Sequence, residues 1–153
     1  MTAITEAVAQ GQAGDRETAR RRLTEIWATI GADGDPFHRC VLAHYLADLQ
    51  DDPADELTWD LRALAAADSL TDERAQRHDS GLSVAGFRPS LHLNLGEDYR
   101  KLGDLGRARE HLALAEAAAP VLGDDGYGEM IRSGIARLAE SLDAERQNVT
   151  GRN

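Results

Sequence analysis

The feature that most constrains this chain is a helical pattern of apolar residues that is interrupted once and then resumes, between Pro89 and Pro120. The first run consists of Leu91, Leu95, Tyr99 and Leu102, and the second of Ala108, Leu112, Ala115 and Ala119. Spacings of three or four residues place side chains on one face of an α-helix. Gly103 and Asp104 separate the two runs, as expected for a turn. The stretch therefore predicts two helices joined by a tight turn.

The same stretch resembles one repeat of the tetratricopeptide family, a unit of about 34 residues that forms a pair of helices. The positions that match the family pattern are Leu95, Gly96, Tyr99, Gly103, Ala108, Leu112, Ala115 and Pro120. His92 departs from the pattern, because the family usually has Trp or a large aliphatic side chain there. The resemblance implies that Gly96 and Ala108 lie where the paired helices approach most closely, that neighbouring pairs stack, and that the protein binds other molecules, usually peptides. An unrelated antiparallel helical hairpin is the alternative.

Weaker versions of the same pattern occur elsewhere in the chain. We interpret residues 3–30 as a degenerate first repeat, 36–67 as a second repeat and 89–120 as the third. Asp15 and Asp52 are expected to cap helices, and Pro36 and Pro53 to stand at the first helical position. Residues 68–88 are an insertion relative to the repeat length, in which 79–86 is rich in Gly and Ser and predicts a loop.

The end of the chain differs from the repeats. Residues 127–145 have one apolar and one charged face, which is typical of a helix that caps a helical stack. Residues 146–153 are expected to form a disordered tail. The predicted fold is therefore all-α, a tetratricopeptide-like stack of antiparallel helix pairs with a C-terminal capping helix, in one domain over 1–145.

Composition and charge exclude several classes of protein. The formal net charge is −10, which argues against binding to nucleic acid because phosphates require a basic surface. Cys40 is the single cysteine, so no intramolecular disulfide can form, and a reducing compartment is expected. No apolar stretch approaches the ~20 residues of a membrane span. We expect a cytoplasmic protein without a membrane partner.

The family resemblance also implies a binding surface, because tetratricopeptide stacks present the first helix of each repeat on their concave side. The residues expected there are Phe37, Cys40, His44 and Asp48 from the second repeat, and Leu93, Glu97, Arg100 and Lys101 from the third. Arg100 and Lys101 lie within one turn and are candidates to hold a carboxylate or phosphate. A solvated face, in which Glu97 pairs with Lys101 four residues later, is the alternative.

Chemistry beyond binding has little support in the sequence. Cys40, His44 and Asp48 are spaced four residues apart, so a thiolate and an imidazole could share a metal ion. One helix rarely supplies a complete site, and no second ligand pair with clear spacing occurs, so we predict neither a metal site nor a cofactor. The chain also lacks a Gly-x-Ser-x-Gly elbow and a phosphate-binding Gly-rich loop, so we do not predict an enzyme.

We therefore expect a binding or adaptor module that recognises a peptide or partner protein in a concave helical groove. Such a module could act alone or as a homodimer. The alternative is a small-molecule or metal-responsive sensor in which residues 68–88 close over the groove as a lid.

Overall fold

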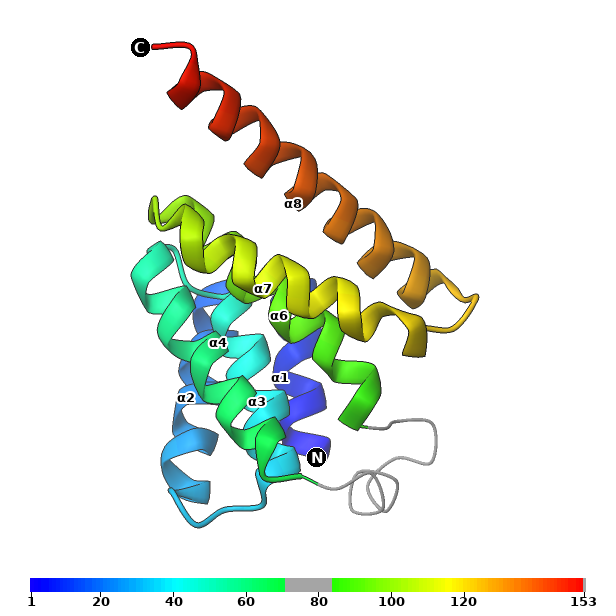
Figure 1. Cartoon of the computed structure of the whole chain (residues 1–153). Helices are drawn as coiled ribbons and strands as arrows, with labels where there is room; N and C mark the ends of the chain where they lie inside the picture. The colour runs from blue at the N-terminus through cyan, green and yellow to red at the C-terminus, as the bar shows by residue number, and fades with distance from the viewer. Residues whose placement is uncertain (71–83, 153) are drawn as a thin grey trace. The chain divides into compact units, whose positions relative to one another are not determined.

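The chain divides into two compact units, Met1–Leu82 and Ser83–Asn153. The computed structural model describes residues 1–70 and 84–152, and Figure 1 traces the whole chain. Both units consist of helices and their connections, and the described residues include no β-strand. The predicted all-α class is therefore confirmed. The boundary between the units falls inside the predicted insertion, residues 68–88, within what the sequence predicts as one domain.

Unit 1 is built from helices in the positions predicted for the first two repeats. These helices are α1 (Thr2–Gln12), α2 (Arg16–Ile30), α3 (Pro36–Asp48) and α4 (Pro53–Asp68). Helix α1 packs against α2, α3 packs against α4, and α2 also contacts α3. Unit 1 is thus a succession of adjacent packed helices joined by short connections (Figure 1).

Local chemistry explains where these helices begin. The Asp15 carboxylate accepts a hydrogen bond from the Thr18 N–H at 3.3 Å, and the Asp52 carboxylate accepts one from the Ala54 N–H at 2.7 Å. Each bond satisfies an N–H that has no partner within its own helix. Pro36 and Pro53 stand at the first positions of α3 and α4, where a missing N–H costs nothing. The predicted caps and prolines are confirmed.

The core of unit 1 lies between α1, α2 and α3. It contains Ile4, Ala7, Leu23, Leu42 and Leu46, all of them buried. Trp27 and Trp59 pack against this cluster, and their rings meet edge to face with centroids 5.1 Å apart. The two rings connect α2 to α4.

Unit 2 contains α6 (Val84–Lys101), α7 (Leu105–Ala118), a short 3-10 helix η1 (Ala119–Val121) and α8 (Gly126–Thr150). Helices α6 and α7 pack against each other, and α8 contacts both. Gly103 has φ 81° in the turn between α6 and α7, a backbone conformation that favours glycine. The helix pair and its turn lie where the sequence predicts the third repeat.

Two helix ends in unit 2 differ from the prediction. Helix α6 begins at Val84 rather than Pro89, so residues 84–88 of the insertion, including part of the predicted loop 79–86, are helical. Pro89 is the sixth residue of α6, where its missing N–H cannot bond the carbonyl four residues before it, so the helix continues through Pro89 with one hydrogen bond fewer. Residues 71–83, the remainder of the predicted lid, lie outside the described residues.

Helix α8 continues to Thr150, five residues beyond the predicted end at Glu145. Residues 146–150, predicted to belong to a disordered tail, therefore form the end of this helix. No proline or glycine interrupts the sequence between Glu145 and Gly151, and Arg146 and Gln147 are good helix formers.

Helices α6 and α8 approach closely at two glycines. A Cβ atom placed on Gly96 would lie 2.6 Å from Leu138 Cδ2 and 3.5 Å from the Ala108 backbone oxygen. A Cβ atom on Gly134 would lie 2.7 Å from Leu93 Cδ2. Each glycine therefore accommodates a leucine of the other helix, and the predicted close approach of Gly96 to Ala108 is present as well.

Candidate functional site

Arg100, predicted as an anion contact, is already paired with acidic side chains in unit 2. Its Nε and Nη2 donate to Glu97 Oε2 at 3.1 and 2.9 Å, and its Nη1 donates to Glu145 Oε1 at 3.1 Å. The hydrogen bond to Glu97 raises the pKa of Arg100 above its usual value, partial burial opposes this, and Glu145 adds to the rise. This pairing is an argument against Arg100 as a binding group, because an incoming anion would have to displace two carboxylates.

Leu93 and His92 also have packing partners inside unit 2. Leu93 is buried and lies against Gly134 of α8. His92 is buried, and its Nδ1 lies 3.1 Å from Nδ1 of His111 on α7. The ring of Tyr99 stacks on His111 with centroids 5.5 Å apart, and burial lowers the pKa of His111. The departure from the family pattern at His92 thus belongs to a packed aromatic cluster.

The predicted residues of the second repeat lie in different environments on α3. Phe37 and Cys40 are buried, and His44 is half-buried with its ring 5.4 Å from that of Tyr45. Asp48 is exposed at the end of the helix and lines a pocket. The groove predicted between the second and third repeats, with Lys101 on its wall, involves both units and stays a prediction.

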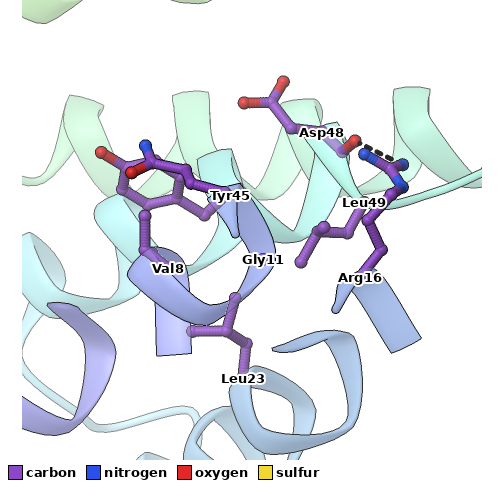
Figure 2. A pocket seen from close by; sticks show the side chains of 8 residues that line it. Val8, Gly11, Arg16, Leu23, Tyr45, Asp48 and Leu49 are labelled. Carbon is purple, nitrogen blue, oxygen red and sulfur yellow. Dashed lines mark hydrogen bonds between the residues drawn. The ribbon is translucent and has the colours of Figure 1, made fainter. Parts of the chain in front are cut away.

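The pocket that contains Asp48 lies among α1, α2 and α3 and has a volume of about 180 Å³ (Figure 2). Its apolar lining consists of Val8 from α1, Leu23 from α2, and Leu49 at the end of α3, together with the ring of Tyr45. Leu23 is fully buried and forms the floor, whereas Val8 and Leu49 are half-buried. The pocket is thus an apolar depression within unit 1.

The edge of this pocket is polar. Gln12, Arg16 and Asp48 line it and are exposed. Arg16 Nη2 donates to the backbone oxygen of Asp48 at 3.1 Å, drawn as a dashed line in Figure 2, and this bond places the guanidinium beside the opening. Arg16 forms no ion pair with any carboxylate in the described part of the chain. The remaining N–H groups of Arg16 are therefore directed donors at the edge of an apolar depression.

Of the residues predicted to bind a ligand, only Asp48 lines this pocket. Val8, Gly11 and Arg16 belong to the predicted degenerate repeat, which supplied no candidate. Gly11 could have indicated this pocket in the sequence, because a glycine inside a helix often marks a close contact with a neighbouring helix. A Cβ atom on Gly11 would lie 3.1 Å from Ala19 Cβ on α2. A small residue that allows α1 to approach α2 also leaves space beside Leu49, 3.6 Å from the same position.

Comparison of the chain with models of protein families, with curated proteins and with solved structures found no match. Among the described residues, no helix combines the length and the apolar character that crossing a membrane would require. The fold and the pocket thus define an all-helical protein with a small apolar depression and a polar edge.

Proposed function

We propose that this chain is a binding module with a tetratricopeptide-like arrangement, which recognises a peptide or a segment of a partner protein. The pocket of Figure 2 receives one apolar side chain of the ligand, and Arg16 holds an acidic group next to it. The observation that carries the proposal is the combination of an apolar floor with an oriented, charge-uncompensated guanidinium at the edge of one pocket.

The size of the pocket favours a single side chain over a larger ligand. A cavity of about 150 Å³ holds one benzene molecule, so a pocket of about 180 Å³ fits one leucine-sized or phenylalanine-sized group. The polar edge can then form hydrogen bonds with the backbone of the bound peptide, since Gln12 and Tyr45, like Arg16, line the pocket and carry hydrogen-bonding groups. A carboxylate on the guanidinium adds a charge-assisted hydrogen bond.

The repeat arrangement is supported by the small residues of both units. Ala7 and Ala43, which the repeat pattern aligns with Gly96, are fully buried, as are Ala19 and Ala108 in the paired helices. Small residues at the contacts of successive helix pairs are what close stacking requires.

The test uses a peptide that ends in leucine. We expect the peptide with a free C-terminal carboxylate to bind, and its amidated form to bind about tenfold or more weakly, as loss of a charged hydrogen bond predicts. Arg16→Ala should weaken the free-acid peptide to a similar extent, and Val8→Phe should abolish binding by filling the pocket. Fluorescence anisotropy of labelled peptides measures each affinity.

Arg21→Ala is the matched control, because Arg21 is another exposed arginine of α2 that does not line the pocket. Its affinity should equal that of the parent. If the parent, Arg16→Ala and Val8→Phe proteins all bind the peptide equally, the binding site is elsewhere.

A further inference from the structure

A second cavity of unit 1, of about 270 Å³, lies between the connection from α2 to α3 and the end of α4. Its walls are small residues of that connection, including Gly34, and of α4, including Ala65 and Ala66. The charged residues that line it are Arg39 from α3 and Arg62 from α4. The cavity is thus lined by small residues on one side and by two cationic side chains from different helices.

Both guanidinium groups are held on the pair of tryptophan rings. The Cζ atom of Arg39 lies 4.0 Å from the ring centroid of Trp27, and that of Arg62 lies 4.4 Å from the centroid of Trp59 and 5.9 Å from that of Trp27. Arg39 also donates a hydrogen bond through Nη1 to the backbone oxygen of Gly31. Both Cζ atoms lie within 5.9 Å of the centroid of the Trp27 ring, so the two cations are close to each other.

Neither cation is neutralised by a neighbour. In the described parts of both units, Arg39 and Arg62 form no ion pair with a carboxylate. The nearest acidic residue before Arg39, Asp35, accepts hydrogen bonds from the N–H groups of Phe37 and His38 at 2.9 and 3.2 Å. Two like charges near one ring repel each other, and no carboxylate of residues 1–70 or 84–152 forms an ion pair with either of them. An anion bound between the two guanidiniums would remove this repulsion.

The way the arginines are held leaves their donors available. A cation–π contact uses the face of the guanidinium, whereas all five of its N–H groups point outward in the plane. Apart from the Arg39 bond to Gly31, the edges of both groups can therefore donate to oxygen atoms in the cavity. Planar edges fixed on rings recognise carboxylate or phosphate oxygens in pairs, at little further loss of side-chain freedom.

We propose that this cavity binds a small organic anion with two negative charges, either a dicarboxylate or a phosphate monoester. The two charges of the ligand match the two guanidiniums, and its carbon skeleton lies against the wall formed by Gly34, Ala65 and Ala66. The volume lies just below the roughly 300–1,000 Å³ that is typical of small-molecule sites, which suits a metabolite of a few carbon atoms. The proposal is independent of the pocket of Figure 2.

The experiment titrates the full chain with succinate and, separately, with phenyl phosphate. Trp27 and Trp59 are the two tryptophans of the chain, so tryptophan emission reports directly on the cluster, and titration calorimetry gives an independent affinity. We expect saturable binding of at least one of the two. Succinamate has the shape of succinate with one charge removed, and it should bind about tenfold or more weakly. The tighter of succinate and phenyl phosphate identifies the oxyanion that the site prefers.

The variants test whether both arginines take part. Arg62→Gln removes the exposed cation of the site, and Arg39→Gln removes the half-buried one. Each change should weaken binding about tenfold or more. Arg21→Gln, an equal change of charge on the exposed face of α2, should leave the affinity unchanged. Circular dichroism verifies that the variants are folded.

Three results would overturn the proposal: no saturable binding of either dianion, equal affinity for succinate and succinamate, or an equal loss of affinity in Arg21→Gln. Because Arg62 is exposed, its variant decides the question even if Arg39→Gln fails to fold.

Discussion

Replacing Gly96 with leucine tests the closest approach of helices in unit 2. The first added atom would lie 2.6 Å from Leu138 Cδ2, and the next nearest atoms are backbone, the Ala108 oxygen at 3.5 Å and the Leu112 nitrogen at 3.7 Å. Leu138 Cδ2 is the end of a side chain that can adjust to one added atom, whereas the two backbone atoms are held by α7. The rest of the new side chain would have to push α6 away from α7 or α8.

Two opposing effects set the magnitude. Overpacking of a dense interior typically costs about 1–3 kcal/mol. Leucine is also a better helix former than glycine, by roughly 0.8 kcal/mol at an interior position. We expect Gly96→Leu to lower the free energy of unfolding by a net value of about 1–2 kcal/mol, because the backbone atoms that it meets cannot retreat and the overpacking exceeds the gain in helix propensity. For Gly96→Ala, the one contact below 3 Å is with the end of the Leu138 side chain, so the change should be within about 1 kcal/mol of zero.

Gly106 provides the matched control, because it also lies in a helix but a Cβ atom there would meet only Asp104 Oδ1, at 3.7 Å. Gly106→Leu should be neutral or stabilising by up to about 1 kcal/mol. Urea unfolding followed by circular dichroism gives the free energies, and hydrogen exchange of α6 and α8 peptides locates the change. Equal stability of Gly96→Leu and the parent, or an equal loss in Gly106→Leu, would refute the reasoning. In a Leu138→Ala background, the cost of Gly96→Leu should become smaller.

Two further predictions concern the turn and the histidine pair of unit 2. Gly103→Ala should lower the free energy of unfolding by about 1–2 kcal/mol, because φ is 81° and a side chain disfavours that conformation; denaturant unfolding measures the loss, and an unchanged midpoint would contradict it. Burial lowers the pKa of His111 below 6.5, so the folded state binds fewer protons than the unfolded state. The free energy of unfolding should therefore fall as the pH drops below 6.5 toward the folded pKa, and His111→Gln should show a smaller fall in melting temperature between about pH 7.5 and pH 5.5. An equal pH dependence in both proteins would show that His111 does not contribute.

The helices were predictable from the sequence where short-range chemistry decides them. Asp15 and Asp52 cap helices, and Gly103 turns the chain, because each acts on a backbone within a few residues. The ends that the sequence did not predict depend on longer-range terms. Val84 starts α6 although Pro89 removes a backbone hydrogen bond, and α8 continues to Thr150 beyond its apolar stripe, because packing elsewhere in each helix sustains the extension.

The candidate sites were less predictable, because they combine residues from helices that are far apart in the sequence. Arg100 has the spacing of an anion contact in the sequence, yet Glu145, on a different helix, takes up its charge. No sequence motif around Arg16 indicated a binding role, yet its hydrogen bond to the backbone oxygen of Asp48 places it at a pocket. Whether a surface cation is available to a ligand depends on which carboxylates the fold brings to it, and a periodic pattern contains no such information.

The two arginines of the second cavity differ from the ion-paired arginines of the chain in how their side chains are held. Arg100 and Arg109 each have an acidic partner supplied by α8, and Arg20 and Arg22 have acidic partners within unit 1. Arg39 and Arg62 have aromatic faces in place of carboxylates. An aromatic ring holds a guanidinium in position without neutralising it, whereas an ion pair does both. The tryptophan pair therefore keeps two positive charges oriented, and the described residues give neither of them an ion-pair partner, which is the electrostatic condition for recognising an anion.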